Sequence, residues 1–152
     1  MKIFNGVKTK NLQKISWFAV TNEASQKLIK CNLSNSDVRV LFYFLSNINQ
    51  NNSVKYSNYK EIADKTDLSV SSVKKSMMNL RNEDLLTKDV NFSKTIFINP
   101  NFIYAGDYTT ISDKITYYDE IKKSYKDKQS KRKEALNDTM AINGNKQGRK
   151  AK

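Results

Sequence analysis

Apolar residues recur at helical spacing through the middle of the chain, in two runs separated by a short polar turn. The first run predicts a helix from Tyr59 to Lys65, and the second predicts a helix from Val70 to about Asn82. Ser69 is placed to cap the second helix. Between the helices, Asp67 occupies the turn position at which helix-turn-helix proteins often have Gly. Asp tolerates a left-handed backbone better than most residues. The pattern predicts a helix-turn-helix.

Two β-prone runs follow the second helix and flank a short turn that contains Asn and Ser. Leu85 to Val90 and Lys94 to Ile98 predict a hairpin, which Pro100 ends. Upstream, Ser53 to Ser57 predicts a short strand that would pair with this hairpin. We therefore expect a mainly α fold with a small antiparallel β-hairpin, in the order of a winged helix-turn-helix.

The segment before this motif supplies a scaffold. Lys14 to Val20 is β-prone, and Thr21 is placed to cap a short helix from Asn22 to Lys30. Ser34 to Asp37 matches a capping pattern for the next helix. That helix has a wide apolar face, which we expect to be buried over more than half of its circumference; its members are Val38, Val40, Leu41, Phe42, Phe44, Leu45 and Ile48.

The chain divides into four parts on these patterns. Residues 1–12 form a loose N-terminal arm, and residues 13–110 form the winged helix-turn-helix domain. Residues 111–136 form a helix that changes from amphipathic to basic, and residues 137–152 form a disordered basic tail. The helix has an apolar stripe consisting of Ile111, Ile115, Tyr118, Ile121 and Tyr125. This stripe either packs on the domain itself or forms a homodimer.

Basic residues are concentrated at the two ends of the chain, whose net charge is +12. Residues 1–33 hold six Lys and one Glu, and residues 112–152 hold twelve cations and six acids, whereas residues 34–111 are nearly balanced, with nine cations and eight acids. Basic flanks of this kind attract a polyanion without specifying its sequence. Nucleic acid is favoured over a membrane surface, because no strong apolar face lies opposite the lysines.

The composition also excludes several kinds of chemistry. The chain has no His and a single Cys31, so neither a His-based metal site nor an intrachain disulfide is expected. The four glycines lie far apart, which excludes a phosphate-binding loop. No apolar run is long enough to span a membrane, and no signal region is present. We expect a cytoplasmic protein with no catalytic residue, metal or cofactor and with no membrane partner.

The outward face of the second motif helix carries short polar side chains near its start and cations further along. Such a face suits the major groove of DNA, although a solvated helix face has the same composition. Lysines near the hairpin tip would contact the DNA backbone, or would only protect a sheet edge. The predicted DNA-binding residues are Ser69, Ser71, Ser72, Lys74, Lys75, Asn79, Arg81, Lys88, Asn91 and Lys94.

The chain resembles the RepL replication proteins of small plasmids from Gram-positive bacteria over roughly residues 14–108. The resemblance rests on the element order, on Glu61-Ile62-Ala63 before Leu68-Ser69, and on Ile98-Asn99-Pro100-Asn101 followed by Gly106-Asp107. It implies a replication initiator that recognises double-stranded DNA at its plasmid origin, together with host replication proteins as partners. The last of these motifs is the more distinctive, because many regulators share the helix-turn-helix.

Three hypotheses about function follow. The first is a non-enzymatic, sequence-specific DNA-binding protein that initiates or controls plasmid replication. The second keeps the same fold but makes the protein a transcriptional regulator. The third is a nicking enzyme that uses Tyr56, Tyr104 or Tyr117 as its nucleophile, although no histidine is available to hold a metal and no base lies beside these tyrosines in sequence.

Overall fold

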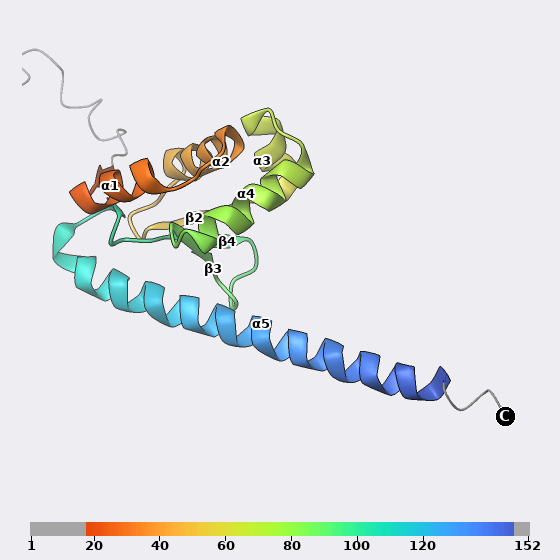
Figure 1. Cartoon of the computed structure of the whole chain (residues 1–152). Coiled ribbons are helices and arrows are strands. Elements are labelled where there is room, and N and C mark those ends of the chain that lie inside the picture. The colour runs from red at the N-terminus through yellow and green to blue at the C-terminus, as the bar shows by residue number, and fades with distance from the viewer. Residues whose placement is uncertain (1–17, 148–152) are drawn as a thin grey trace, which may run out of the picture.

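The computed structural model describes residues 18–147, with side chains as far as Met140. The helices are α1 (Asn22–Lys30), α2 (Asn35–Ser46), α3 (Tyr59–Thr66), α4 (Val70–Asn82) and α5 (Ile111–Gln147), with a 3-10 turn, η2, at Tyr108–Thr110. The strands are β1 (Phe18–Val20), β2 (Ser53–Lys55), β3 (Leu86–Lys88), β4 (Thr95–Ile98) and β5 (Ile103–Ala105). The predicted arm at residues 1–12, the first part of the predicted N-terminal strand and the last five residues lie outside this range. Figure 1 shows the helices α1 to α4 gathered together above the strands, and α5 running below them.

Side-chain caps begin all four short helices. Thr21, Ser34, Asn58 and Ser69 each accept a hydrogen bond from a backbone N–H in the first turn of the helix that follows. Ser34 forms a complete capping box, because the Asp37 carboxylate accepts in return from the Ser34 N–H. These caps explain why the predicted start of each helix agrees with the observed one.

The turn between α3 and α4 depends on a left-handed residue. Asp67 has φ 55° and ψ 48°, and its N–H donates to the carbonyl of Ala63. The turn then passes through Leu68 to the cap of α4. A β-branched residue at position 67 would be strained in this conformation. The left-handed backbone therefore explains why Asp is suitable at this turn.

The predicted hairpin is present and is the centre of a three-stranded antiparallel sheet. The strand order is β2-β4-β3, with Val54 opposite Ile96 and Leu86 opposite Ile98. The pairing of β2 with the hairpin is confirmed. A second sheet, which the sequence did not predict, pairs β1 with β5, with Ala19 opposite Tyr104. Mainly helical content with small antiparallel sheets is the predicted fold class. Apart from β5 and η2, which the sequence did not predict, the elements follow the predicted order.

The main core lies between the helices and the three-stranded sheet. Its buried apolar side chains come from every element between α2 and β5. The expectation that α2 is buried over more than half of its circumference was wrong. Val38 is 39% exposed and Phe42 is 60% exposed, because α3 and α4 pack along one side of α2 and leave the other side open. Val70, the first residue of the apolar run that predicts α4, is also 38% exposed.

A buried asparagine joins the two sheets. Asn52 has a left-handed backbone with φ 58° and only 1% of its surface exposed. Its Nδ2 donates to the carbonyls of Ile98 at 3.3 Å and Ile103 at 2.6 Å, and its Oδ1 accepts from the N–H of Ala105 at 2.8 Å. All polar groups of the amide are therefore satisfied, and β4 and β5 are held together.

The Asn-Pro-Asn segment forms the corner between β4 and β5. Asn99 is buried; its Nδ2 donates to the carbonyl of Asp84 at 2.9 Å and its Oδ1 accepts from the N–H of Asn101 at 3.0 Å. The carbonyl of Asn101 accepts from the hydroxyl of Thr21 at 3.2 Å. The Asn-Pro-Asn corner, which is part of the more distinctive motif of the resemblance, thus connects the hairpin to the end of α4 and the start of α1.

The nearby Gly-Asp pair also has a backbone role. Gly106 has φ +93°, and a Cβ at this position would lie 2.6 Å from the carbonyl oxygen of Gln50. Asp107 then caps η2 by accepting from the N–H of Thr109. Only glycine fits this sharp bend, which directs the chain into α5.

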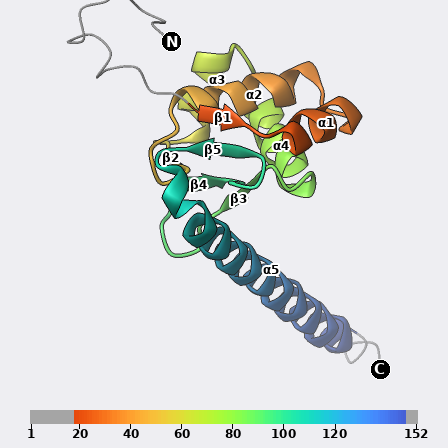
Figure 2. The same ribbon diagram turned by 90° about the vertical axis from the view of Figure 1, so that its left-hand side faces the viewer.

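Helix α5 packs on the hairpin along its first turns and then extends away from the domain (Figures 1 and 2). Tyr118 and Ile121 are buried against Phe97, so this part of the stripe packs on the protein itself. The helix continues to Gln147, whereas the sequence predicted disorder from residue 137. No proline interrupts that segment, so the helix continues although Asn137, Asp138, Thr139 and Gly144 are weak helix formers. The side chains at positions 133–140 are all exposed.

Candidate nucleic-acid interface

The outward face of α4 begins with a cluster of three serine hydroxyls. The hydroxyl oxygen of Ser69 lies 2.9 Å from those of Ser71 and Ser72, and it also accepts from the N–H of Ser72 as the helix cap. Ser69 and Ser71 are exposed. The cluster leaves hydroxyl groups available at the helix N-terminus, where the helix dipole favours negative charge.

Two lysines follow on the exposed side of α4. Lys74 and Lys75 are both exposed, and the amino group of Lys74 lies 5.9 Å from the ring centroid of Tyr59. Tyr59 itself stacks on Tyr56, with 5.8 Å between ring centroids. The aromatic pair gives Lys74 an apolar surface to rest on and leaves its charge in solvent.

Asn79 does not share this exposed face. Its Nδ2 lies 3.3 and 3.4 Å from the carboxylate oxygens of Asp37, so it points toward α2 rather than outward as expected. Burial alone would raise the pKa of Asp37, but hydrogen bonds from Ser76, Ser34 and Asn79 outweigh it and hold the pKa below its ordinary value. Asn79 and Asp37 therefore connect α4 to the capping box of α2.

Arg81 is partly covered by the C-terminal helix. Its guanidinium lies 5.4 Å from the ring centroid of Tyr125 on α5. Arg81 is half-buried, whereas Lys74 and Lys75 are open to solvent. Arg81, the last of the predicted DNA-binding residues on α4, thus lies where α4 meets α5.

The hairpin presents its predicted residues in different ways. Lys88 is half-buried at the end of β3, whereas Asn91 and Lys94 are exposed in the connection to β4. Lys94 has φ 65°, and its carbonyl accepts from the N–H of Tyr56 at 3.1 Å. The N–H of Asn91 donates to the carboxylate of Asp89 at 2.7 Å. These backbone contacts fix the tip of the hairpin relative to the start of α3.

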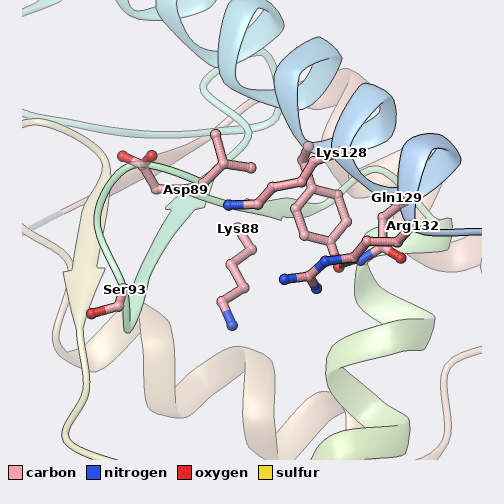
Figure 3. A pocket seen from close by; sticks show the side chains of 8 residues that line it. Lys88, Asp89, Ser93, Lys128, Gln129 and Arg132 are labelled. Carbon is pink, nitrogen blue, oxygen red and sulfur yellow. Dashed lines mark hydrogen bonds between the residues drawn. The ribbon is translucent and has the colours of Figure 1, made fainter. Parts of the chain in front are cut away.

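A cavity of about 260 Å³ lies between the hairpin and α5. The sequence predicted a C-terminal helix over residues 111–136 that changes from amphipathic to basic, but it did not predict that the basic part faces the hairpin. Figure 3 shows Lys128 and Arg132 reaching from α5 toward the side of β3 that carries Lys88. The only sequence signal for this arrangement is the spacing of Tyr125, Lys128 and Arg132 by three and four residues, which places them along one side of a helix.

The tyrosines considered as nucleophiles lie in different surroundings. Tyr56 and Tyr104 are buried, and the Tyr104 hydroxyl has no hydrogen-bond partner among the described residues. Burial raises the pKa of Tyr56, and the neighbouring Tyr59 adds to this shift. Tyr117 is 44% exposed and its ring packs edge-on against Phe97. Both buried tyrosines are poorly placed to attack a DNA phosphate.

The part of the chain that the structure describes offers neither a metal site nor a membrane-spanning helix. Residues 18–147 contain no group of three or more His, Cys, Asp or Glu side chains arranged to hold a metal ion. In the same range, no helix combines the length and the apolar character that crossing a membrane requires.

Comparison with known proteins gave one match. A family model described as Firmicute plasmid replication protein (RepL) matches residues 24–147. Neither the curated proteins nor the solved structures contain a match. The matched range includes all of α5, so it extends well beyond the residues that carry the resemblance in the sequence.

Proposed function

Because the chain belongs to the RepL family of Firmicute plasmid replication proteins, we propose that it binds double-stranded DNA at its plasmid's origin in a sequence-specific manner. By occupying the origin, it initiates or controls replication without catalysing a reaction itself, and host replication proteins are then recruited. The observation that carries this proposal is the outward face of α4. It offers serine hydroxyls and two exposed lysines, while the opposite face of the helix is closed into the core.

The division of work between the elements follows from their shapes. The major groove is about 12 Å wide and accepts one α-helix, so α4 enters it and its polar side chains contact base edges. The hairpin lies beside the helix, and Lys88 and Lys94 contact the flanking backbone. Contacts to phosphates set the orientation, and contacts to bases give the specificity. The basic ends of the chain add affinity that does not depend on sequence.

Binding to labelled origin duplex, with footprinting at low and moderate salt, tests this proposal. Lys74→Ala and Lys75→Ala should each weaken specific binding by about 1–3 kcal/mol if the side chain contacts a base. Lys30→Ala removes one exposed cation from α1 and is the matched control, for which we expect little change in specificity. A discrete footprint that survives moderate salt supports origin recognition. Unchanged affinity in both α4 variants would contradict the assignment of α4 to the interface.

A replicon assay separates initiation from transcriptional regulation. A plasmid that carries the origin should be maintained when the wild-type protein is supplied, and lost when the α4 variants are supplied. Repression of a nearby promoter without plasmid maintenance would exclude the initiation role. Covalent protein–DNA adducts after incubation with supercoiled origin plasmid would exclude the non-enzymatic role.

A further inference from the structure

We propose that the cavity between the hairpin and α5 is a second DNA contact, a seat for one phosphate group of the duplex backbone. This inference rests on the proposed function, because it assumes that duplex DNA is the ligand. It gives two cations of α5 a defined contact, whereas the sequence analysis gave the basic C-terminal flank only a general attraction to a polyanion. The seat is referred to below as the α5 phosphate seat, and its cations are Lys88, Lys128 and Arg132.

The first argument is the gathering of like charges. In Figure 3, Lys128 and Arg132 extend from α5 toward the side of the hairpin on which Lys88 lies. In the part of the chain whose side chains are described, the one ion pair joins Lys122 to Asp84. None of the three cations of the seat has a carboxylate within salt-bridge distance in that part. Positive groups that converge without an ion-paired carboxylate repel one another, and a bound anion reduces that repulsion.

The acid that lines the cavity does not neutralise it. The carboxylate of Asp89 is buried and points away from the three cations (Figure 3). One of its oxygens accepts from the N–H of Asn91, and the other has no partner among the described residues. Asp89 therefore shapes the hairpin tip and leaves the positive charge of the cavity available.

A neutral donor completes the site. Ser93 and Tyr125 both line the cavity, but the Ser93 oxygen points away from the three cations in Figure 3. The hydroxyl of Tyr125 accepts from Nε2 of Gln129 at 3.1 Å. Because that bond uses an acceptor position of Tyr125, its own O–H proton remains available to an anion. Water takes about 30 Å³ per molecule in the liquid, so a cavity of about 260 Å³ holds a phosphate group and several waters.

The position of the seat favours a backbone phosphate over a free anion. Tyr125 is shared by the cavity and by Arg81 of α4, and Lys88 belongs to the hairpin. The seat is thus continuous with both elements proposed to contact DNA. The backbone of a duplex bound to α4 and the hairpin would therefore also pass the α5 phosphate seat.

The decisive experiment compares two double variants of the full chain with equal loss of charge. Lys128→Ala/Arg132→Ala removes the α5 cations of the seat. Lys123→Ala/Lys131→Ala removes two exposed lysines of α5 that do not line the cavity. We expect the first variant to make the dependence of log K on log salt concentration shallower by about 1, the value for one lost phosphate contact. Origin and unrelated duplexes should lose affinity by the same factor, because phosphates carry no sequence information.

Each outcome decides the proposal. A clearly smaller change in the control supports the seat, whereas equal changes in both variants overturn it, because α5 would then act only through its overall charge. Loss of specificity in Lys74→Ala with no effect of Lys128→Ala/Arg132→Ala overturns the seat and leaves the proposed function standing. If the wild-type protein does not bind duplex DNA, both proposals fall.

A second measurement identifies the ligand. Ethylation of one backbone phosphate should weaken binding of the wild-type protein and have no effect on Lys128→Ala/Arg132→Ala, because that variant has already lost the contact. Titration with inorganic phosphate at constant ionic strength forms the other arm. Saturable phosphate binding that Lys128→Ala/Arg132→Ala abolishes, with duplex binding unchanged, would assign the cavity to a small anion and overturn the proposal. Circular dichroism verifies that the variant retains its helix.

Discussion

The helical body and α5 are held in place by different means. In the body, α2, α3 and α4 close a continuous apolar core, and the buried polar groups of Asp37 and Asn52 are satisfied by hydrogen bonds. Among the side chains of α5 that the structure describes, as far as Met140, two are buried: Tyr118 and Ile121. A partly exposed ion pair of 2.7 Å joins Lys122 to Asp84. Further along the helix, the side chains of residues 133–140 are all exposed.

The difference shows which part sets stability and which part sets surface charge. Truncation of a buried apolar side chain in the body lowers the free energy of unfolding by several kcal/mol, so the stability of the fold depends on these residues. The α5 phosphate seat, in contrast, is positioned by a short row of contacts at Tyr118, Ile121 and Tyr125. Changes in the body should therefore unfold the protein, whereas changes in α5 should alter DNA binding with little loss of stability.

The largest expected effect is in the core of the body. Phe44 is 0% exposed and packs edge-on against Tyr43 and Tyr56. Phe44→Ala should lower the free energy of unfolding by about 3–5 kcal/mol, measured by urea denaturation. Phe42→Ala, on the exposed side of the same helix, is the control and should cost less than about 1 kcal/mol. Similar losses in the two variants would contradict the one-sided burial of α2.

The next effect is at the buried asparagine. Asn52→Ala leaves the N–H of Ala105 and two strand carbonyls without partners and forces a left-handed alanine. We expect a loss of about 3 kcal/mol in the free energy of unfolding. Asn51→Ala, at the exposed neighbouring position, should be nearly neutral. A small effect of Asn52→Ala would mean that the two sheets are not held together through this amide.

Asp37 should make stability depend on pH. Its folded pKa lies below the ordinary value of 3.8, so its contribution is complete above pH 3.8 and is lost as the pH falls through the folded pKa. Asp37→Asn should cost about 2 kcal/mol at pH 6, because hydrogen bonds to a charged acceptor are lost. The difference between the two proteins should narrow below pH 3.8. A difference independent of pH would contradict the assignment.

A smaller effect is expected where α5 joins the body. The hydroxyl of Tyr118 lies 3.1 Å from the carboxylate of Asp84 and is removed in Tyr118→Phe. We expect a loss of about 1 kcal/mol in the free energy of unfolding. Hydrogen exchange should report faster opening of α5 than of α4 in this variant. Equal acceleration in both helices would show that α5 is an integral part of the core.

The smallest effect is expected in the distal part of α5. Leu136 is 59% exposed, so its side chain lies largely in solvent. Leu136→Ala should change the free energy of unfolding by less than about 0.5 kcal/mol at low protein concentration. Sedimentation at increasing concentration tests the predicted homodimer with the same variant. A stability loss that grows with concentration would assign Leu136 to an interface between copies.

Local signals in the sequence were sufficient for the helix starts and for the hairpin. Ser34, Asn58 and Ser69 act through residues three positions away, and Asp67 acts through its own backbone, so short stretches determine them. The sequence did not predict the pairing of β1 with β5, because these strands are far apart along the chain. The exposure of Phe42 likewise depends on which helices pack beside α2.

The sequence predicted the candidate site, like the fold, only where the signal is local. The composition of α4 indicated the exposed positions of Lys74 and Lys75, but the contact of Asn79 with Asp37 requires two helices to meet. The cavity beside α5 is lined by residues of the hairpin between positions 88 and 93 and by residues of α5 between positions 125 and 132. Only folding brings these two segments together. Helical spacing could place Lys128 and Arg132 on one side of α5, but it could not show what that side faces.

The pairing of β1 with β5 has a consequence for the order in which the protein forms during synthesis. Thr21 and Asn101, which bond at this junction, are 80 residues apart. At about 5–20 residues per second, the ribosome needs about 4–16 s to add that length of chain. For that time the first strand and α1 leave the ribosome without their partner, whereas α2, α3 and α4 find one another through nearer contacts. The segment made first is therefore the one expected to join the domain last.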